Sequence, residues 1–395
     1  MKELKYKLRS VTAFEIAEDA LIKNFCRLAD SDIGAAITAY TEITKLLLSA
    51  NKTLADYLCE LLTYSESPLI ESYLKDKSEN QFYAIEYDVS VIRELAAFSA
   101  HKVKDYLFGK FNENLIFSLP EYVSGGFDKT AEYFIEHVRK YGAGIYARYK
   151  AFVYENGAVV PVENPDTVRL SEFKKYEAQR GQIVDNTRAF IAGQPADNVL
   201  LYGDRGTGKS STIKALINEY DMLRIIQLDK RDVAAIPSIY EAVKNSPLKF
   251  IIFIDDLSFG ENDECFGTLK KVLEGSLCVR PANAVIYATT NRRHLIKETE
   301  SSRVGDNVHR ADEIDESVSL SDRFGLFITF LAPNKDVYLE IVQGIAIDRG
   351  IIIDKDKLYR CAERFALRRN SRSPRTARQF IDSIQSKIAL GIDID

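Results

Sequence analysis

Apolar residues recur at every third or fourth position through most of the first 150 residues of the chain. This spacing places them on one face of a helix and predicts a mostly helical N-terminal region. The pattern is clearest over residues 32–48, 91–107 and 128–150. We therefore expect long amphipathic helices in these three segments.

The pattern changes over residues 151–162, where apolar and polar residues alternate around Asn156 and Gly157. Alternation predicts strands, and an Asn-Gly pair tolerates positive φ at both turn positions, so this segment is expected to form a β-hairpin. Residues 163–167 (ENPDT) then have the composition of a linker. We expect the hairpin to end an N-terminal domain of residues 1–165.

Short apolar runs alternate with helical segments from Leu170 onward. Strands of a parallel sheet contain such runs because both of their faces are covered. We therefore predict an α/β fold with a parallel sheet over residues 166–333, followed by a helical lid over residues 334–395. The runs expected to be strands are NVLLYG (198–203), RIIQLD (224–229), FIIFIDD (250–256), AVIYATT (284–290) and GLFITFL (325–331).

Composition excludes several classes of protein. The 395 residues are 46% hydrophobic and carry a net charge of −5, which fits two or three globular domains. No apolar stretch approaches the ~18 residues of a membrane span, and the charged start MKELKYKLRS lacks the apolar core of a signal peptide. The five cysteines form no C-x-x-C pair. We therefore expect a cytoplasmic protein rather than a transporter, a secreted module or a zinc finger.

The most specific motif is GDRGTGKSS at residues 203–211, which matches the phosphate-binding pattern G-x-x-x-x-G-K-[ST]. An apolar run precedes it and a helical segment follows it, so its backbone amides can converge on an anion at a helix N-terminus. We expect Lys209 to reach the β- and γ-phosphates of ATP and Ser210 to hold Mg²⁺. The residues predicted to bind the nucleotide are Gly203, Asp204, Arg205, Gly206, Thr207, Gly208, Lys209, Ser210 and Ser211.

Polar residues also end two other predicted strands. Asp255 and Asp256 follow FIIFI, and Asn291 follows AVIYATT. We expect Asp255 to join Ser210 in holding the metal and Asp256 to orient or deprotonate the attacking water. Asn291 would contact the γ-phosphate or that water. Each of these residues alone also fits an ordinary turn, and it is their spacing from the phosphate motif that indicates Mg²⁺-dependent ATP hydrolysis.

These motifs, followed by SLSDRFG and SPRTARQFI, occur in an order that resembles the AAA+ ATPases, a family of ring-forming P-loop motors, over roughly residues 168–390. The resemblance implies that Asn291 is the sensor-1 residue, Arg323 an arginine finger and Arg375 the sensor-2 arginine. The last two boxes are similar to those of the Holliday-junction branch-migration motor and of clamp loaders. The whole stretch looks closer still to a bacterial group of predicted AAA+ ATPases of unknown function. The resemblance to the AAA+ ATPases implies a homo-oligomeric ring, with a hexamer as one form, and catalysis at subunit interfaces.

Two features depart from the AAA+ pattern. Asp256 stands where most members have glutamate, and its shorter side chain leaves open a looser contact with water and slow hydrolysis. Residues 292–318 form a polar insert before the finger, which fits either a substrate or ring-contact loop or a solvated surface loop. We expect an ATPase that remodels an unknown protein client. The alternatives are a nucleotide-gated switch with very slow turnover, a P-loop kinase and a DNA-associated motor. The charge balance does not favour nucleic acid, and no membrane partner is expected.

Overall fold

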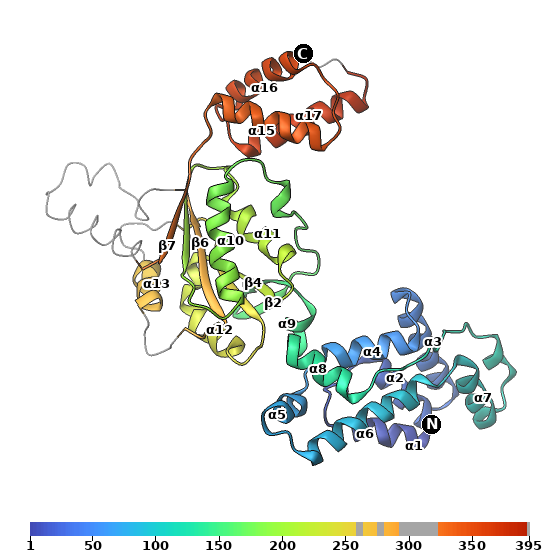
Figure 1. The fold of residues 1–395 in the computed structure, drawn as a ribbon. Coiled ribbons are helices and arrows are strands. Elements are labelled where there is room, and N and C mark those ends of the chain that lie inside the picture. Colours follow the sequence, from blue (N-terminus) through green and yellow to red (C-terminus); the bar gives the residue numbers. More distant parts are fainter. Residues whose placement is uncertain (258–263, 275–279, 292–322, 393–395) are drawn as a thin grey trace. The chain divides into compact units, whose positions relative to one another are not determined.

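The computed structural model describes residues 1–257, 264–274, 280–291 and 323–392 (Figure 1). The chain divides into two compact units, Met1–Arg148 and Tyr149–Asp395. The first unit is helical, and the second contains a mostly parallel sheet followed by C-terminal helices. The predicted α/β fold class, with a helical N-terminal region and a helical C-terminal region, is confirmed.

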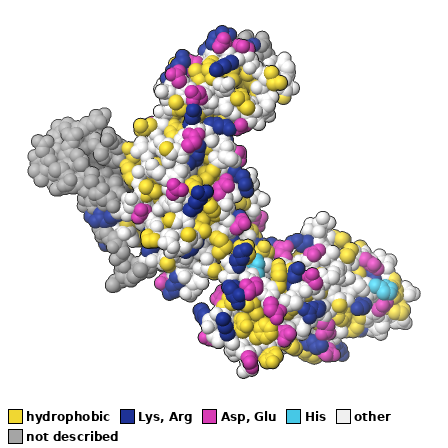
Figure 2. Space-filling view, in the orientation of Figure 1, with side chains coloured by type: hydrophobic (Ala, Val, Ile, Leu, Met, Phe, Trp, Pro, Cys, Tyr) yellow, Lys and Arg dark blue, Asp and Glu magenta, His cyan; other side chains and the backbone are white. Residues whose placement is uncertain are grey.

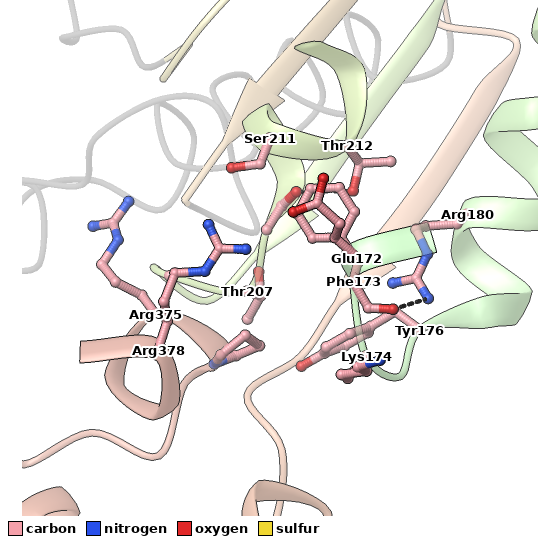
Figure 3. A pocket seen from close by; sticks show the side chains of 13 residues that line it. Glu172, Phe173, Lys174, Tyr176, Arg180, Thr207, Ser211, Thr212, Arg375 and Arg378 are labelled. Atoms are coloured by element: carbon pink, nitrogen blue, oxygen red, sulfur yellow. Dashed lines mark hydrogen bonds between the residues drawn. The ribbon is translucent and has the colours of Figure 1, made fainter. Parts of the chain in front are cut away.

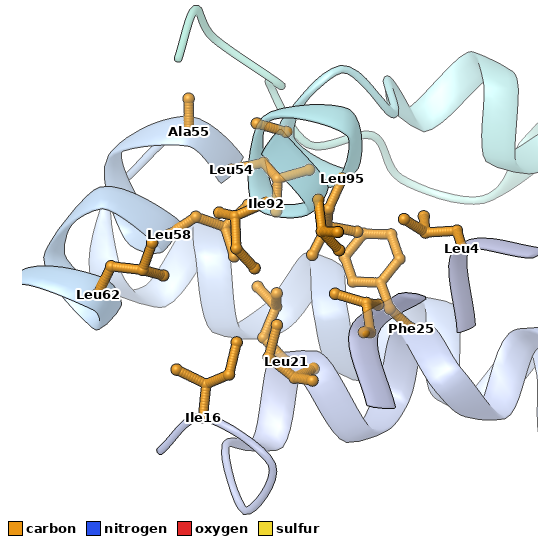
Figure 4. Close-up of a cluster of buried hydrophobic side chains, with 14 of the residues drawn as sticks. Leu4, Ile16, Leu21, Phe25, Leu54, Ala55, Leu58, Leu62, Ile92 and Leu95 are labelled. Atoms are coloured by element: carbon orange, nitrogen blue, oxygen red, sulfur yellow. The ribbon is translucent and has the colours of Figure 1, made fainter. Parts of the chain in front are cut away.

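The helices of the first unit bury their apolar faces in one core. Figure 4 shows Leu21 and Phe25 of α2 gathered with Leu58 of α4 and with Ile92 and Leu95 of α6. All five side chains are at most 1% exposed, so the helical spacing seen in the sequence reflects burial. The elements of this unit are α1 (Lys2–Arg9), α2 (Ala20–Asp30), α3 (Ile33–Ala50), α4 (Leu54–Tyr64), α5 (Pro68–Asp76), α6 (Glu79–Ala96), α7 (Ala100–Phe111), the 3₁₀ turn η1 (Asn114–Ser118), α8 (Ala131–Tyr141) and α9 (Gly144–Arg148).

Two of the expected long helices are each divided in two. Over residues 91–107 the apolar pattern runs on, but Ser99 is the N-cap of α7 and accepts a hydrogen bond of 3.2 Å from the backbone amide of Lys102. Such a cap stabilises a new helix start, so the chain turns between α6 and α7. Over residues 128–150 the interruption comes at Gly142, whose φ of 73° ends α8. Periodicity alone did not reveal either break.

The second unit is built on a seven-stranded sheet with the order β2-β1-β4-β5-β6-β3-β7. Strands β1 and β2 are antiparallel, and the other neighbouring strands are parallel. All five predicted apolar runs are strands. The bounds are β1 (Ala151–Glu155), β2 (Ala158–Pro161), β3 (Val199–Gly203), β4 (Leu223–Leu228), β5 (Lys249–Ile254), β6 (Ala284–Thr290) and β7 (Leu326–Phe330).

The predicted hairpin is present, but it belongs to the second unit. Asn156 and Gly157 form its turn with φ values of 53° and 82°. Strand β1 also pairs in parallel with β4, and Phe152 lies opposite Ile226. This pairing extends the sheet by two strands, so the compact unit begins at Tyr149, whereas the N-terminal domain was expected to extend to residue 165. Local alternation identified the hairpin, whereas its partner strand lies some seventy residues further along the chain.

Helices cover the sheet and form the C-terminal lid. Ile183 of α10 and Leu216 of α11 pack against Leu201 and Phe253 on one face of the sheet. The lid has a core of its own, which includes the buried side chain of Tyr338. The remaining elements of this unit are the 3₁₀ turns η2 (Leu170–Glu172) and η3 (Lys230–Ala235), α10 (Glu177–Ile191), α11 (Lys209–Glu219), α12 (Ile236–Val243), α13 (Glu264–Glu274), and the lid helices α15 (Lys335–Asp348), α16 (Lys355–Arg369) and α17 (Pro374–Ala389).

Charged side chains of both signs are spread over the surface. On the face drawn in Figure 2, Lys and Arg are interspersed with Asp and Glu in both units. Of the helices that the structure describes, none is long and apolar enough to cross a membrane.

Candidate functional site

The motif at residues 203–211 forms a tight loop between β3 and α11. Gly203, Gly206 and Gly208 have φ values of 134°, 77° and 97°, which L-residues with side chains rarely adopt. A Cβ atom on Gly203 would lie 2.0 Å from the carbonyl oxygen of Phe330, so this glycine also lets the loop pack against the end of β7. Gly208 caps α11 and has no atom within 4 Å of its would-be Cβ position. The loop therefore presents the N-terminus of α11 to open space, as anion binding requires.

Lys209 is held inside this loop. Its side chain is 5% exposed, and its Nζ donates hydrogen bonds to the carbonyl oxygens of Gly203 and Asp204, both at 2.8 Å, and to Oδ1 of Asn291 at 3.0 Å. Burial lowers the pKa of Lys209 to about 8, although three neighbouring aspartates act in the opposite direction. The amine is thus a desolvated charge whose orientation is already fixed.

Asp255 follows β5 and faces the start of α11. Its Oδ1 accepts hydrogen bonds from the hydroxyls of Ser210 and Thr289, both at 2.6 Å. A hydroxyl and a carboxylate are hard oxygen donors of the kind that Mg²⁺ prefers. The described residues include no group of three or more His, Cys, Asp or Glu that could hold a metal ion. A cation here would therefore depend on Ser210, Asp255 and oxygen atoms of a ligand.

Asp256 lies beside Asp255 but has a different environment. Its φ of 53° turns the chain sharply after the strand, and its backbone amide donates to Oγ1 of Thr289 at 3.0 Å. Its Oδ1 accepts a hydrogen bond of 2.6 Å from Nδ2 of Asn291. Asn291 therefore connects Asp256 to Lys209 through the two ends of its side-chain amide. Thr289, which contacts both aspartates, was not predicted; its only signal in the sequence was its place two residues before Asn291.

The lid reaches the same loop through α17. The backbone amide of Arg375 donates to the carbonyl oxygen of Gly206 at 3.1 Å. A Cβ atom on Gly206 would lie 2.7 Å from Oγ of Ser373, so a side chain there would collide with the lid. A cavity of about 410 Å³, which we call the phosphate-side cavity, opens between these parts. It is lined by Arg205, Gly206, Thr207, Gly208, Lys209, Ser210, Ser211, Asp255, Asp256, Thr289, Asn291 and Arg375.

A second cavity, of about 250 Å³, adjoins the first (Figure 3). The two share Gly206, Thr207, Gly208, Ser211 and Arg375. The second cavity is also lined by Glu172, Phe173, Lys174, Tyr176, Arg180, Thr212, Pro374 and Arg378. Its walls therefore come from the P-loop and the start of α11, from the lid, and from residues 172–180 before and at the start of α10, to which the sequence analysis assigned no site residue.

Tyr176 fixes that segment between the sheet and the lid. Its ring stacks on Phe330 with centroids 5.4 Å apart, and its hydroxyl donates to the carbonyl oxygen of Leu331 at 2.6 Å. Lys174, two residues before Tyr176, forms an ion pair of 2.5 Å with Asp348 of α15. The same segment thus contacts the end of β7 and a lid helix. Apolar periodicity gave no signal for this arrangement because the contacts join distant parts of the chain.

Three of the predicted site residues lie apart from the phosphate-side cavity. Gly203 shapes the loop, and the carboxylate of Asp204 accepts a hydrogen bond of 2.6 Å from the backbone amide of Ala332. Arg323 precedes β7, which runs parallel to β3 with Phe330 opposite Gly203. Arg323 therefore lies beyond the opposite end of β7, and the strand alone spans roughly 13 Å. The polar insert at residues 292–318 lies outside the described residues.

Comparison with known proteins gives a family but no activity. No curated protein matches the sequence. Among solved structures, the Holliday junction branch migration motor RuvB of Thermotoga maritima is 19% identical, with a TM-score of 0.38 over 57% of this chain and 68% of that chain. A RuvB variant from the same organism is 20% identical, with a TM-score of 0.40 over 57% and 68%. A family model described as "Protein of unknown function (DUF815)" matches residues 147–388, which span nearly the whole second unit. The chain belongs to the DUF815 family.

Proposed function

We propose that this protein binds ATP with Mg²⁺ and hydrolyses it at the carboxyl edge of the sheet. The observation that carries the proposal is the convergence of Lys209, Ser210, Asp255, Asp256 and Asn291 on one cavity beside a helix N-terminus. These residues come from three different strand ends. A structural turn needs no such convergence, whereas phosphoryl transfer needs donors, a metal site and a base within a few ångströms of one another.

The phosphate-side residues divide into three roles. The amides of Gly206 and Gly208, together with Lys209, bind the phosphates. Ser210 and Asp255 hold Mg²⁺, which neutralises the charge that develops on the phosphate oxygens. Asp256 accepts the proton of the attacking water or orients that water, and the hydrogen bond from Asn291 keeps its carboxylate in place.

The second cavity, which we call the adenosine-side cavity, is the proposed site of the adenosine group. It shares the P-loop glycines with the first cavity, so a nucleotide can extend through both. The ring of Phe173 and the stem of Arg180 provide apolar surface there, and the guanidinium of Arg180 donates to the carbonyl oxygen of Phe173 at 3.4 Å. Adenine is flat and half polar, which suits such a wall.

We further propose that the complete catalytic site includes a neighbouring subunit. Arg323 is at the end of β7 remote from its own P-loop, so a second copy, and not its own nucleotide, is the proposed target of its guanidinium. An arginine supplied in trans stabilises transition-state charge. The lid arginine Arg375 would act within its own subunit. The helical first unit is the proposed binding region for a protein client.

Two alternatives have specific observations in their favour. A switch with very slow turnover is favoured by the short Asp256 side chain and by its hydrogen bond to Asn291, both of which limit its reach to water. A DNA-associated motor is suggested by the finger and lid boxes, but the mixed charges in Figure 2 provide no basic track on that face.

Steady-state phosphate release separates these functions. Wild-type protein should release phosphate from ATP only with Mg²⁺, and Asp256→Asn should bind ATP without releasing phosphate. Asp229→Asn is a matched control, because Asp229 follows the neighbouring strand β4 and its carboxylate binds Arg231 at 2.8 Å. Tight ATP binding with equal, near-zero rates in all three proteins would favour the switch. Stimulation by duplex DNA would favour the motor. Absence of ATP binding would refute the proposal.

A further inference from the structure

Arg205 is the one cation of the P-loop that the phosphate-binding motif does not specify. Its side chain is exposed, and no hydrogen bond or ion pair joins its guanidinium to another of the described residues. Its neighbours Asp204 and Thr207, in contrast, form hydrogen bonds within the fold. The carboxylate of Asp204 accepts a hydrogen bond from the backbone amide of Ala332, and the hydroxyl of Thr207 donates to the carbonyl oxygen of Asp204 at 2.9 Å. The loop is therefore internally stabilised without Arg205.

Arg205 lies between two cavities, and this position indicates which part of a nucleotide it can contact. It lines the phosphate-side cavity together with Asp255, Asp256 and Asn291, but it does not line the adenosine-side cavity. It therefore faces the end of the site where the last phosphate would lie. It also lines a cavity of about 510 Å³ on its other side, whose wall includes Ser371 of the lid.

The lining of the phosphate-side cavity has more positive than negative side chains, which favours the binding of an anionic group. Its lining contains three cations, Arg205, Lys209 and Arg375, and two carboxylates, Asp255 and Asp256. In the proposed function one of those carboxylates serves the metal. A guanidinium presents a planar fork of donors that matches the oxygens of a terminal phosphate. ADP lacks that phosphate, so a group aimed at it would separate the two nucleotides.

We propose that Arg205 binds the terminal phosphate of ATP from within the same subunit, and that it makes the site prefer ATP over ADP. The inference rests on the proposed function. Because Arg205 also lines the cavity beside the lid, its engagement with the last phosphate links the presence of ATP to the lid segment around Ser371. This role is distinct from those of Lys209, which is buried behind the loop, and of Arg323, which is remote from it.

The test compares ATP and ADP affinities by isothermal titration calorimetry with Mg²⁺ present. Arg205→Ala should weaken ATP binding roughly 10- to 100-fold, the usual range for a hydrogen bond to a charged group, and change ADP binding less than about threefold. The ATP affinity of Arg205→Lys should lie between those of the wild type and Arg205→Ala, because lysine keeps the charge but not the forked guanidinium. Arg368→Ala, an exposed arginine of α16 that is not part of the phosphate-side lining, is the matched control and should leave the ratio unchanged.

The outcomes distinguish this inference from the proposed function. Equal losses for ATP and ADP in Arg205→Ala, or no loss for either, would overturn the role of Arg205 while leaving ATP binding by the wild type intact. A wild-type protein that binds neither nucleotide would overturn the proposed function and this inference together. Thermal unfolding of each variant, matched to the wild type, shows that a loss of affinity does not come from a loss of fold.

Discussion

Raising the pH from 7.5 to 9.5 should weaken ATP binding, because it removes the charge of Lys209. The side chain is 5% exposed, and burial lowers its pKa to about 8. In the proposed complex the phosphates keep the amine protonated. A neutral lysine must therefore take up a proton when ATP binds, so ATP binding becomes weaker as the pH rises.

The size of the effect follows from the charged fraction of Lys209. With a pKa of about 8, roughly three quarters of the molecules carry the charge at pH 7.5 and roughly 3% at pH 9.5. The dissociation constant for ATP should rise about 25-fold, which corresponds to about 1.9 kcal/mol. Phosphate groups have a second pKa of about 6, so the charge of the nucleotide is constant over this range.

The free energy of unfolding should change in the opposite direction. The pKa of Lys209 is lowered from 10.5 to about 8 in the folded protein, so between these values the unfolded chain binds more protons than the folded chain. Stability therefore rises with pH through this window, by an amount on the order of 3 kcal/mol at most. Below pH 8 the buried amine is charged, and its desolvation lowers the free energy of unfolding by the full amount. The free protein thus gains stability over the range in which it loses affinity.

Calorimetric titrations of ATP at pH 7.5, 8.5 and 9.5 would measure the effect. Lys209→Arg is the control, because arginine stays protonated throughout and its affinity, although lower, should not vary with pH. Lys209→Ala should bind ATP severely more weakly at every pH while keeping its fold. An ATP affinity of the wild type that is constant over the range, or an equal decline in Lys209→Arg, would refute the assigned role of the buried charge.

Four further variants test the rest of the site. Asp255→Ala should abolish the dependence of ATP affinity on Mg²⁺, whereas Asp256→Asn should retain it and stop phosphate release; identical behaviour of the two in titrations with and without Mg²⁺ would contradict their separate roles. Arg323→Ala should bind ATP normally but lose most hydrolysis, and mixing it with Lys209→Ala should restore part of the rate, because a mixed interface pairs an intact P-loop with an intact finger. No recovery, with mixed oligomers confirmed by sizing, would mean that Arg323 does not act across an interface. Tyr176→Ala should weaken ATP and ADP equally, since the segment it fixes lines the adenosine side; a selective loss of ATP in competition binding would argue against that placement.

Local sequence patterns predicted most of the regular structure. The central runs that form β5 and β6 are apolar at nearly every position because these strands are buried on both faces. The Asn-Gly turn and the glycine pattern of the P-loop were predicted because both depend on backbone conformations that few residues adopt. The helix breaks at Ser99 and Gly142 were missed because an apolar stripe can continue across two separate helices.

Except for Thr289, the residues of the phosphate-side cavity were named from the P-loop motif, from their spacing or, for Arg375, from the AAA+ resemblance, but their mutual contacts were not predicted. The sequence places Asp255 and Asn291 after strands, and the strand order then brings these ends beside the P-loop. The bridging contacts of Thr289 and the segment around Tyr176 had no pattern of their own, because a hydrogen bond or a stacked ring requires only proximity in the fold.

The sequence by itself determined the α/β class, the strands, the P-loop and the polar strand ends, since each depends on residues that are close along the chain. Only the tertiary structure decided that the hairpin joins β4 and that Arg205 faces both the phosphate side and the lid. These facts depend on which strands pair and in which order. Strand pairing is a long-range choice made by burying whole faces against one another, and no local segment of the chain encodes it.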